Sequence, residues 1–140
     1  MTAYIVDASV AVKWVVPQPD SETAHLLRGK RLSAPDILLA EAGNALWVYV
    51  RARALSKQEA MLCFATLRTV PLQWLDLHDL APEAMTLSID LDHPFYDCVY
   101  LAAALVMEVP LVTADRRLIK AARRSPEIGK YLVPLSDVTA

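Results

Sequence analysis

A chain of 140 residues with 55% hydrophobic residues is long enough for one domain, which buries about two-thirds of the surface that its unfolded chain exposes. No apolar run approaches the roughly 20 residues that a membrane span needs, and we expect no secretion signal because the start, MTAYIVDAS, lacks a basic region. The net charge of −2 argues against a general nucleic-acid binder, and Cys63 and Cys98 lack CxxC spacing, so we expect buried, reduced thiols in a cytoplasmic protein.

Short apolar runs alternate along the chain with longer helical patterns. In chain order, the first half predicts a strand at 3–6, helices at 9–16 and 20–28, a strand at 31–34 that ends before Pro35, and helices at 36–54 and 56–69. The second half predicts a strand at 71–77, helices at 79–91 and 94–109, a strand at 110–115, a basic helix at 116–124 and a strand at 131–138. Strands separated by helices pair in parallel, so we predict an α/β fold: one domain, 1–140, forming a three-layer α/β/α sandwich around about five short strands.

The helix predicted at 36–54 has the strongest pattern in the sequence. Asp36 is placed to cap its start, and apolar residues occur on nearly every side, so we expect it to be mostly buried. In the following segment, Ser56 and Glu59 have the spacing of a capping box that opens the next helix. Gly29 is expected to end the short helix predicted at 20–28.

Oxygen-bearing side chains follow two of the predicted strands. Asp7 ends the first strand, and Thr113 and Asp115 end the strand in PLVTAD. In an open parallel sheet, ligands bind in the crevice beyond the carboxyl ends of the strands, where the strand order reverses. We therefore expect these residues to lie at one site.

Two further acids stand in helices that otherwise read as core. Glu41 and Asn44 are the only polar interior residues of the helix at 36–54 and share one face; Glu41 has no Lys or Arg one turn away, so its partner must come from elsewhere in the fold. Asp97 lies in the first turn of the helix at 94–109, where a carboxylate meets unpaired backbone N–H groups.

Each acid also has a purely structural interpretation. Asp7 and Asp115 are suitable helix N-caps, and Asp97 suits a helix dipole, so for these three the structural and functional interpretations stay open. The structural interpretation is weakest for Glu41, since an acid in the middle of a helix caps nothing. All four acids having only structural roles is the less favoured combination.

Four carboxylates at one site need a positive charge among them, because two unit charges about 4 Å apart repel by roughly 4 kcal/mol at an effective dielectric near 20. Oxygen ligands without a nearby His or Cys select Mg²⁺ or Mn²⁺, and such a site suits phosphate-ester chemistry. No Ser–His or Cys–His nucleophile pair is evident. We expect His25, His78 and His93 on the surface or in turns, His93 being notable because it lies close before Asp97.

The segments that hold the four acids are IVDAS, LLAEAGNAL, FYDCVYLAAA and LVTAD. In order and spacing they resemble the PIN-domain nucleases, particularly the short VapC-like toxins of type II toxin–antitoxin pairs, over nearly the whole chain. The resemblance implies a parallel-sheet α/β/α fold, endoribonuclease activity that depends on Mg²⁺ or Mn²⁺, a homodimer, and inhibition by a cognate antitoxin protein.

The resemblance also implies roles for individual residues. The metal-binding catalytic set is Asp7, Glu41, Asp97 and Asp115. Thr113 matches the hydroxyl position beside the last acid and Asn44 a common polar neighbour; Ser9 is counted with these supporting residues.

An RNA substrate is compatible with the acidic composition. Setting the four acids aside leaves twelve acids against fourteen Lys and Arg, and the positive charge gathers in DRRLIKAARR, directly after Asp115. We expect phosphate contacts from Arg116, Arg117 and Lys120, with Lys13 as a weaker candidate; a merely solvated basic face is the alternative. Of the aromatic side chains, including Trp47, Tyr49 and Tyr100, we expect most in the core or an interface rather than stacked on bases.

The helix at 36–54 has more apolar surface than one sheet face can cover, so we expect homodimerisation through it and the helix that follows. Other α/β families fit the sequence less well. A receiver domain needs a Lys after the last strand, a nucleotide-binding domain a glycine-rich loop, and a haloacid-dehalogenase-type phosphatase a DxD where position 9 is Ser. The alternative that stays open is a PIN-fold binding partner without significant catalysis.

Overall fold

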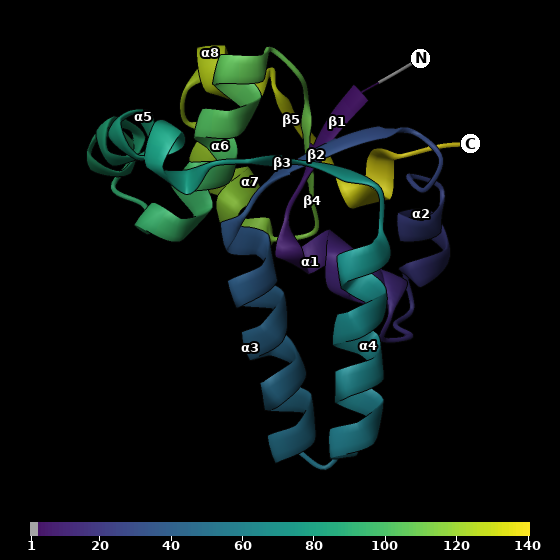
Figure 1. Cartoon of the computed structure of the whole chain (residues 1–140). Coiled ribbons are helices and arrows are strands. Elements are labelled where there is room, and N and C mark those ends of the chain that lie inside the picture. The colour runs from purple at the N-terminus through teal and green to yellow at the C-terminus, as the bar shows by residue number, and fades with distance from the viewer. Residues whose placement is uncertain (1–2) are drawn as a thin grey trace.

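The computed structural model describes residues 3–140 and contains one five-stranded sheet in the order β3-β2-β1-β4-β5. All neighbouring strands pair in parallel. The strands are β1 (Ala3–Val6), β2 (Arg31–Pro35), β3 (Leu72–Leu75), β4 (Leu111–Thr113) and β5 (Leu132–Pro134). Helices flank the sheet on both sides, with α5, α6, α7 and α8 on one side and α1 and α2 on the other (Figure 1). The predicted α/β fold with a parallel five-stranded sheet is confirmed.

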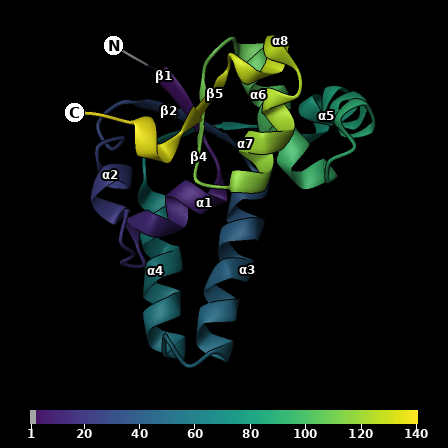
Figure 2. The same ribbon diagram turned by 180° about the vertical axis from the view of Figure 1, so that it is seen from behind.

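The helices alternate with the strands along the chain. They are α1 (Ala8–Ala11), α2 (Ser21–His25), α3 (Ile37–Arg51), α4 (Lys57–Thr69), α5 (Leu77–Leu91), α6 (Phe95–Met107), α7 (Arg116–Arg123) and α8 (Pro126–Gly129), with 3₁₀ turns η1 (Val12–Trp14) and η2 (Leu135–Asp137). Helices α3 and α4 form a hairpin that projects away from the sheet, as both views show (Figures 1 and 2). Within residues 3–140, no helix has the length and apolar character needed to cross a membrane.

Several element boundaries differ from the prediction. The predicted helix at 9–16 is α1 followed by the 3₁₀ turn η1, and α8 was not predicted because its four residues are too few to show a helical period. The strand predicted at 131–138 ends at Pro134, which has no N–H to donate to a ladder, and continues as η2.

The capping box that opens α4 is confirmed: the Ser56 N–H donates to the Glu59 carboxylate at 2.9 Å and the Glu59 N–H donates to the Ser56 hydroxyl at 3.0 Å. Asp36 does not cap its own helix. Its carboxylate instead accepts from the N–H of Leu77 at 3.1 Å, at the start of α5, and its own N–H donates to the Leu75 carbonyl at 2.9 Å. This pairing carries β2 through Pro35, one residue further than predicted.

The core is centred on β1, β4 and α6. Ile5 and Leu111 have no exposed surface, and α6 is buried from Cys98 to Ala104. The expectation that the helix at 36–54 is mostly buried is wrong, since α3 buries only Leu38, Ala42 and Leu46. Its outer part contacts α4 rather than the sheet, which leaves its remaining apolar side chains half-buried or exposed.

The strand order reverses between β1 and β4. The chain builds β1, β2 and β3 outward in one direction and then returns to place β4 on the other side of β1. Val6 of β1 pairs with Val112 of β4. The residues that follow them, Asp7 and Thr113, therefore meet at the carboxyl edge of the sheet. This is the place in an open parallel sheet where ligands bind.

Candidate active site

Asp7 is the buried centre of a hydrogen-bond network that joins β1, α1 and β4. Its carboxylate accepts from the Ser9 hydroxyl at 2.5 Å, from the Val10 N–H at 3.2 Å and from the Thr113 hydroxyl. The Ala114 N–H in turn donates to the Ser9 hydroxyl at 3.0 Å. Asp7 is thus the N-cap of α1, and the same carboxylate lies at the carboxyl edge of the sheet, so its structural role is compatible with the predicted functional one.

Burial dominates the electrostatics of Asp7, which is 5% exposed. Desolvation raises the pKa of Asp7 to about 6, against the hydrogen bonds from Ser9, Thr113 and Val10, and the negative charge of Asp115 raises it further. A carboxylate kept in its charged form here at neutral pH is costly unless a positive charge joins it.

Glu41 finds its partner on α6. The Tyr100 hydroxyl donates to a Glu41 carboxylate oxygen at 2.5 Å, joining residues 59 apart in the chain. Partial burial raises the pKa of Glu41, opposed by the bond from Tyr100, and the charges of Asp97 and Asp115 raise it further. Burial and the neighbouring Glu41 charge also raise the pKa of Tyr100, which is 1% exposed and so stays a proton donor.

Asp97 lies in the first turn of α6, as expected, and is held by His93. The His93 Nε2 lies 2.7 Å from the Asp97 carboxylate, and the side chains are 9% and 24% exposed. Burial raises the pKa of Asp97 against the bond to His93, and the charge of Asp115 raises it again. His93 therefore lies in the turn before α6, as expected, and from that half-buried position it contacts Asp97.

Asp115 caps α7 by accepting from the N–H groups of Arg117 at 2.9 Å and Leu118 at 3.3 Å, while its own N–H donates to the Thr113 hydroxyl at 3.0 Å. Its charge raises the pKa of each of the other three acids, and the charge of Asp97 also raises the pKa of Glu41, so Asp115 links the four electrostatically. Of the other predicted site residues, Ser9 and Thr113 contact Asp7, whereas Asn44 is exposed on α3 and bonds to none of the acids in the described part of the chain.

The donor chemistry of these residues fits a hard divalent cation. Four carboxylates from four separate elements repel one another, and within residues 3–140 neither Lys nor Arg forms an ion pair with any of them. In the same residues, no three Asp, Glu, His or Cys side chains converge closely enough to enclose an ion by themselves. A cation at this edge therefore needs water ligands or rotated side chains beside direct carboxylate contacts, an arrangement that Mg²⁺ adopts readily because it keeps several waters.

A pocket of about 480 Å³ opens beside two of the acids. Its lining includes Asp97, Asp115 and His93 together with Arg117, Lys120 and Arg124 of α7. Lys13 does not join this group: its ammonium pairs with Asp20 at 2.9 Å and donates to Gln18 at 2.9 Å, and its side chain is 11% exposed. The pocket places Arg117, Lys120 and Arg124 beside Asp97 and Asp115, so it can hold an anion next to these two acids.

Sequence reasoning gave neither Tyr100 nor His93 a role in holding the acids. A signal existed for each. His93 precedes Asp97 by one helix turn, and the hydroxyl of a tyrosine in a helix of Leu, Val and Ala needs a buried acceptor. Which acceptor Tyr100 finds depends on how α3 packs against α6, and no local pattern contains that information.

Comparisons with known proteins agree with this architecture. A family model described as PIN domain matches residues 4–124. Ribonuclease VapC1 of Mycobacterium tuberculosis is 31% identical over 125 residues, covering 86% of this chain and 92% of the relative. Ribonuclease VapC12 of the same organism is 28% identical over 125 residues, covering 89% and 95%.

Solved structures show the same fold at lower identity. PAE2754 of Pyrobaculum aerophilum superposes with a TM-score of 0.70 at 22% identity, covering 96% of this chain and 85% of that one. A toxin–antitoxin complex from Klebsiella pneumoniae gives 0.65 at 14% identity, covering 94% and 97%. VapC20 of Mycobacterium tuberculosis, a toxin that cleaves the sarcin–ricin loop, gives 0.66 at 16% identity, covering 84% and 94%.

Proposed function

The chain belongs to the PIN-domain family, and from that premise we propose that it is a Mg²⁺- or Mn²⁺-dependent endoribonuclease, the toxin of a toxin–antitoxin pair. Two of its relatives are ribonucleases by name, and one of its structural neighbours is a toxin–antitoxin complex. The observation that carries the proposal is the acidic edge, formed by Asp7, Glu41, Asp97 and Asp115 from separate elements. The charge of Asp115 acts on each of the other three acids, and none of the four has a Lys or Arg partner in the described residues.

In this proposal the four carboxylates hold the cation, directly or through water. The bound cation supplies Lewis-acid activation of the phosphodiester and of the attacking water. The chain's own residues fix the acids: Thr113 and Ser9 orient the Asp7 carboxylate, Tyr100 holds Glu41 on α3, and His93 holds Asp97. Because three of the acids have a raised pKa, cation binding competes with protons and weakens as the pH falls.

We propose phosphate contacts by the exposed side chains of Arg116, Arg117 and Lys120, which follow directly on Asp115. These contacts steer an RNA strand past the carboxylates, and binding weakens with salt. Lys13 serves this role less directly, because it is engaged with Asp20.

The proposed homodimer rests on the α3–α4 hairpin. A largely apolar groove of about 440 Å³ runs between the two helices, lined by Leu46, Trp47, Met61 and Phe64. Trp47 is 54% exposed and Met61 62% exposed, so a second copy of the chain has apolar surface to cover. A monomer in light scattering at micromolar concentration contradicts this part of the proposal. The cognate antitoxin is the second proposed protein partner.

We also propose that the protein acts in the cytoplasm. Cys63 and Cys98 are free thiols, Cys98 buried and Cys63 half-buried, which suits a reducing compartment.

Cleavage of total RNA and transfer RNA by purified, antitoxin-free protein tests the activity, with Mg²⁺, with Mn²⁺ and with EDTA. We expect discrete fragments with either metal that vanish in EDTA and in the nearly isosteric variant Asp97→Asn. Fragments that persist in EDTA contradict the metal dependence. No cleavage by a folded protein that binds metal favours instead a PIN-fold binding partner without significant catalysis.

A further inference from the structure

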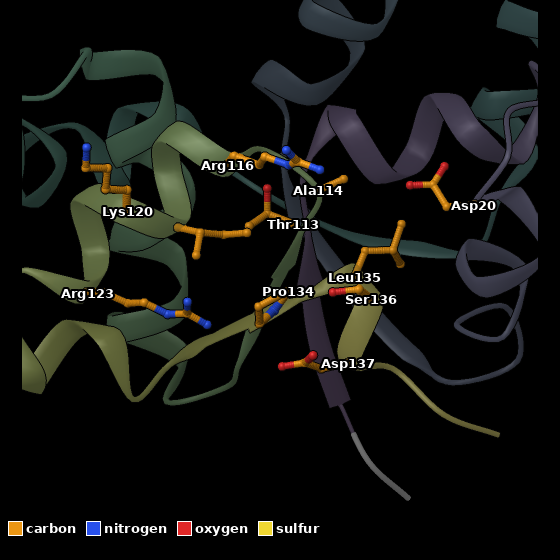
Figure 3. A pocket seen from close by; sticks show the side chains of 11 residues that line it. Asp20, Thr113, Ala114, Arg116, Lys120, Arg123, Pro134, Leu135, Ser136 and Asp137 are labelled. Atoms are coloured by element: carbon orange, nitrogen blue, oxygen red, sulfur yellow. The ribbon is translucent and has the colours of Figure 1, made fainter.

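We call the pocket that Asp97 and Asp115 line the acidic pocket; a second pocket lies on the other side of α7, between α7, β5 and η2. We call it the α7–β5 pocket; it has a volume of about 640 Å³ and is lined on one side by Arg116, Lys120 and Arg123 and on the other by Pro134, Ser136 and Asp137. In Figure 3 the guanidinium groups of Arg116 and Arg123 point toward the middle of the pocket. Its volume is within the roughly 300–1,000 Å³ of small-ligand sites, which accommodates a nucleotide.

The sequence of α7 divides its cations between the two pockets. Arg116, Lys120 and Arg123 recur at the spacing of one helix face, whereas Arg117 and Arg124 lie one position further around. The buried face of α7 consists of Leu118, Ala121 and Ala122. Burial of this face fixes the orientation of the helix, so both sets of basic side chains face solvent. Only Lys120 lines both pockets. The basic helix α7 therefore separates the two pockets, and different arginines of the helix line each pocket.

The positive charge of the α7–β5 pocket is largely uncompensated. In the part of the chain that the structure describes, no ion pair involves Arg116, Lys120 or Arg123. Of the two carboxylates in the lining, Asp20 is paired with Lys13 at 2.9 Å, so Asp137 is the one acid that stands against three cations. Asp137 lies across from the arginines, so an anion is favoured on the α7 side of the pocket and disfavoured on the η2 side (Figure 3).

The pocket adjoins the acidic edge through Thr113 and Arg116. Thr113 lines the pocket, and its hydroxyl donates to the Asp7 carboxylate. Arg116 follows Asp115 directly, and the two residues face different pockets. A chain of phosphates that crosses the start of α7 at the acids therefore meets Arg116 next and Arg123 two turns later.

We propose that the α7–β5 pocket is a subsite for the single-stranded RNA that flanks the scissile phosphodiester, with Arg116 and Arg123 binding successive phosphates and Lys120 between the two pockets. The inference rests on the proposed ribonuclease function. In this arrangement phosphates lie along α7, and bases lie toward Ser136 and Asp137. The subsite contributes to substrate affinity and not to the chemical step.

The test compares the double variant Arg116→Gln/Arg123→Gln with the control Arg68→Gln, which removes the charge of an exposed arginine on α4 outside both pockets. Binding of a labelled single-stranded RNA is measured in EDTA across a salt series, so that no cleavage occurs. Cleavage of the same RNA with Mg²⁺ then gives kcat and KM separately. A third variant, Arg116→Lys/Arg123→Lys, keeps the charge, and circular dichroism verifies folding of all variants.

We expect the double glutamine variant to bind RNA about tenfold more weakly at low salt, with the slope of log K against log salt reduced by about 1.4, because two single-strand phosphate contacts are lost. KM rises to match while kcat stays within about twofold of wild type. The lysine variant recovers most of the binding, and Arg68→Gln binds and cleaves like wild type.

Unchanged RNA binding and salt slope in the double glutamine variant overturn the subsite, as does a fall in kcat with unchanged affinity. A mononucleotide that binds wild type as tightly as the RNA does, and loses affinity equally in the double variant, overturns the strand interpretation in favour of a small-anion pocket. If the variants behave as expected in EDTA but wild type cuts no RNA with metal, the subsite stands and the proposed nuclease function fails.

Discussion

Asp7, at the end of β1, is 5% exposed, whereas Leu62, on α4, is 70% exposed, so the molecule buries a charge and exposes a large apolar side chain. Around Asp7 the buried polar groups satisfy one another, and no buried side-chain polar atom of residues 3–140 lacks a hydrogen-bond partner. Along the α3–α4 hairpin, apolar side chains form a groove that none of residues 3–140 fills.

Both regions depart from the general rule that apolar residues are buried and charges exposed. Each departure leaves a group without the partner that would stabilise it: a counter-charge for the acid and a contact surface for the apolar side chains. We propose that a cation compensates the buried carboxylate and its neighbouring acids, and that another chain covers the exposed apolar groove. Folding alone requires neither feature. Departures of this kind are expected where a protein performs its function.

The same substitution in the two regions gives the largest expected contrast. Leu111→Ala removes a side chain with no exposed surface from β4, and we expect a loss of about 3 kcal/mol in the free energy of unfolding. Leu62→Ala, on the exposed hairpin, is expected to cost less than about 0.5 kcal/mol. Urea denaturation measures both. Equal losses of unfolding free energy in the two variants contradict the assignment of Leu111 to the core and Leu62 to the exposed hairpin. Weaker self-association of Leu62→Ala in light scattering supports the hairpin as the surface that contacts a second copy.

The charge at Asp7 gives a pH-dependent contrast of intermediate size. Its pKa rises from 3.8 to about 6 on folding, so between these pH values the folded protein holds more protons than the unfolded chain, and rising pH lowers stability through this window. The full effect is about 2–3 kcal/mol. In EDTA, wild type should therefore lose stability relative to Asp7→Asn from about pH 4 to pH 6.

Urea denaturation in steps of pH, with the two proteins side by side, measures this difference and cancels the other titrating groups. Added Mg²⁺ should return stability to wild type at pH 7 and not to the variant, because the cation binds only the folded, charged site. A pH-independent difference between the two proteins contradicts the buried charge.

The smallest contrast concerns the tyrosines of the two regions. Tyr100→Phe removes the donor that fixes Glu41, so we expect activity to fall about 10- to 100-fold at limiting Mg²⁺ and stability to fall by about 1–2 kcal/mol. Tyr49→Phe, on half-buried α3, is the matched control and should change neither. Recovery of Tyr100→Phe at saturating Mg²⁺ identifies a role in positioning a metal ligand. Wild-type activity at every Mg²⁺ concentration contradicts that role.

Local patterns in the sequence predict the fold well because they act over short distances. The alternation of apolar runs and helices predicts a parallel sheet, and Ser56 with Glu59 marks the start of α4. The positions of Asp7 and Asp115 between a strand and the following helix also follow from these patterns, although β4 ends at Thr113, two residues earlier than predicted.

Features that depend on packing between distant segments could not be predicted. Asp36 was expected to cap α3 and instead serves α5, and α3 was expected in the core because its apolar residues surround the helix. Both errors have one cause. The sequence shows which side chains favour burial or a hydrogen bond, but the partner that each one contacts depends on the tertiary structure. The ligand roles of the four acids stay a prediction.

Binding of Mn²⁺ measured by titration calorimetry at pH 7 tests the central claim most directly. The comparison uses wild type, Asp97→Asn and Asp79→Asn, because Asp97 and Asp79 are both acids in the first turn of a helix and only Asp97 faces the acidic pocket. We expect wild type and Asp79→Asn to bind alike and Asp97→Asn at least about tenfold more weakly. Equal binding by all three folded proteins, or no binding by wild type, contradicts a metal site at the carboxyl edge of the sheet.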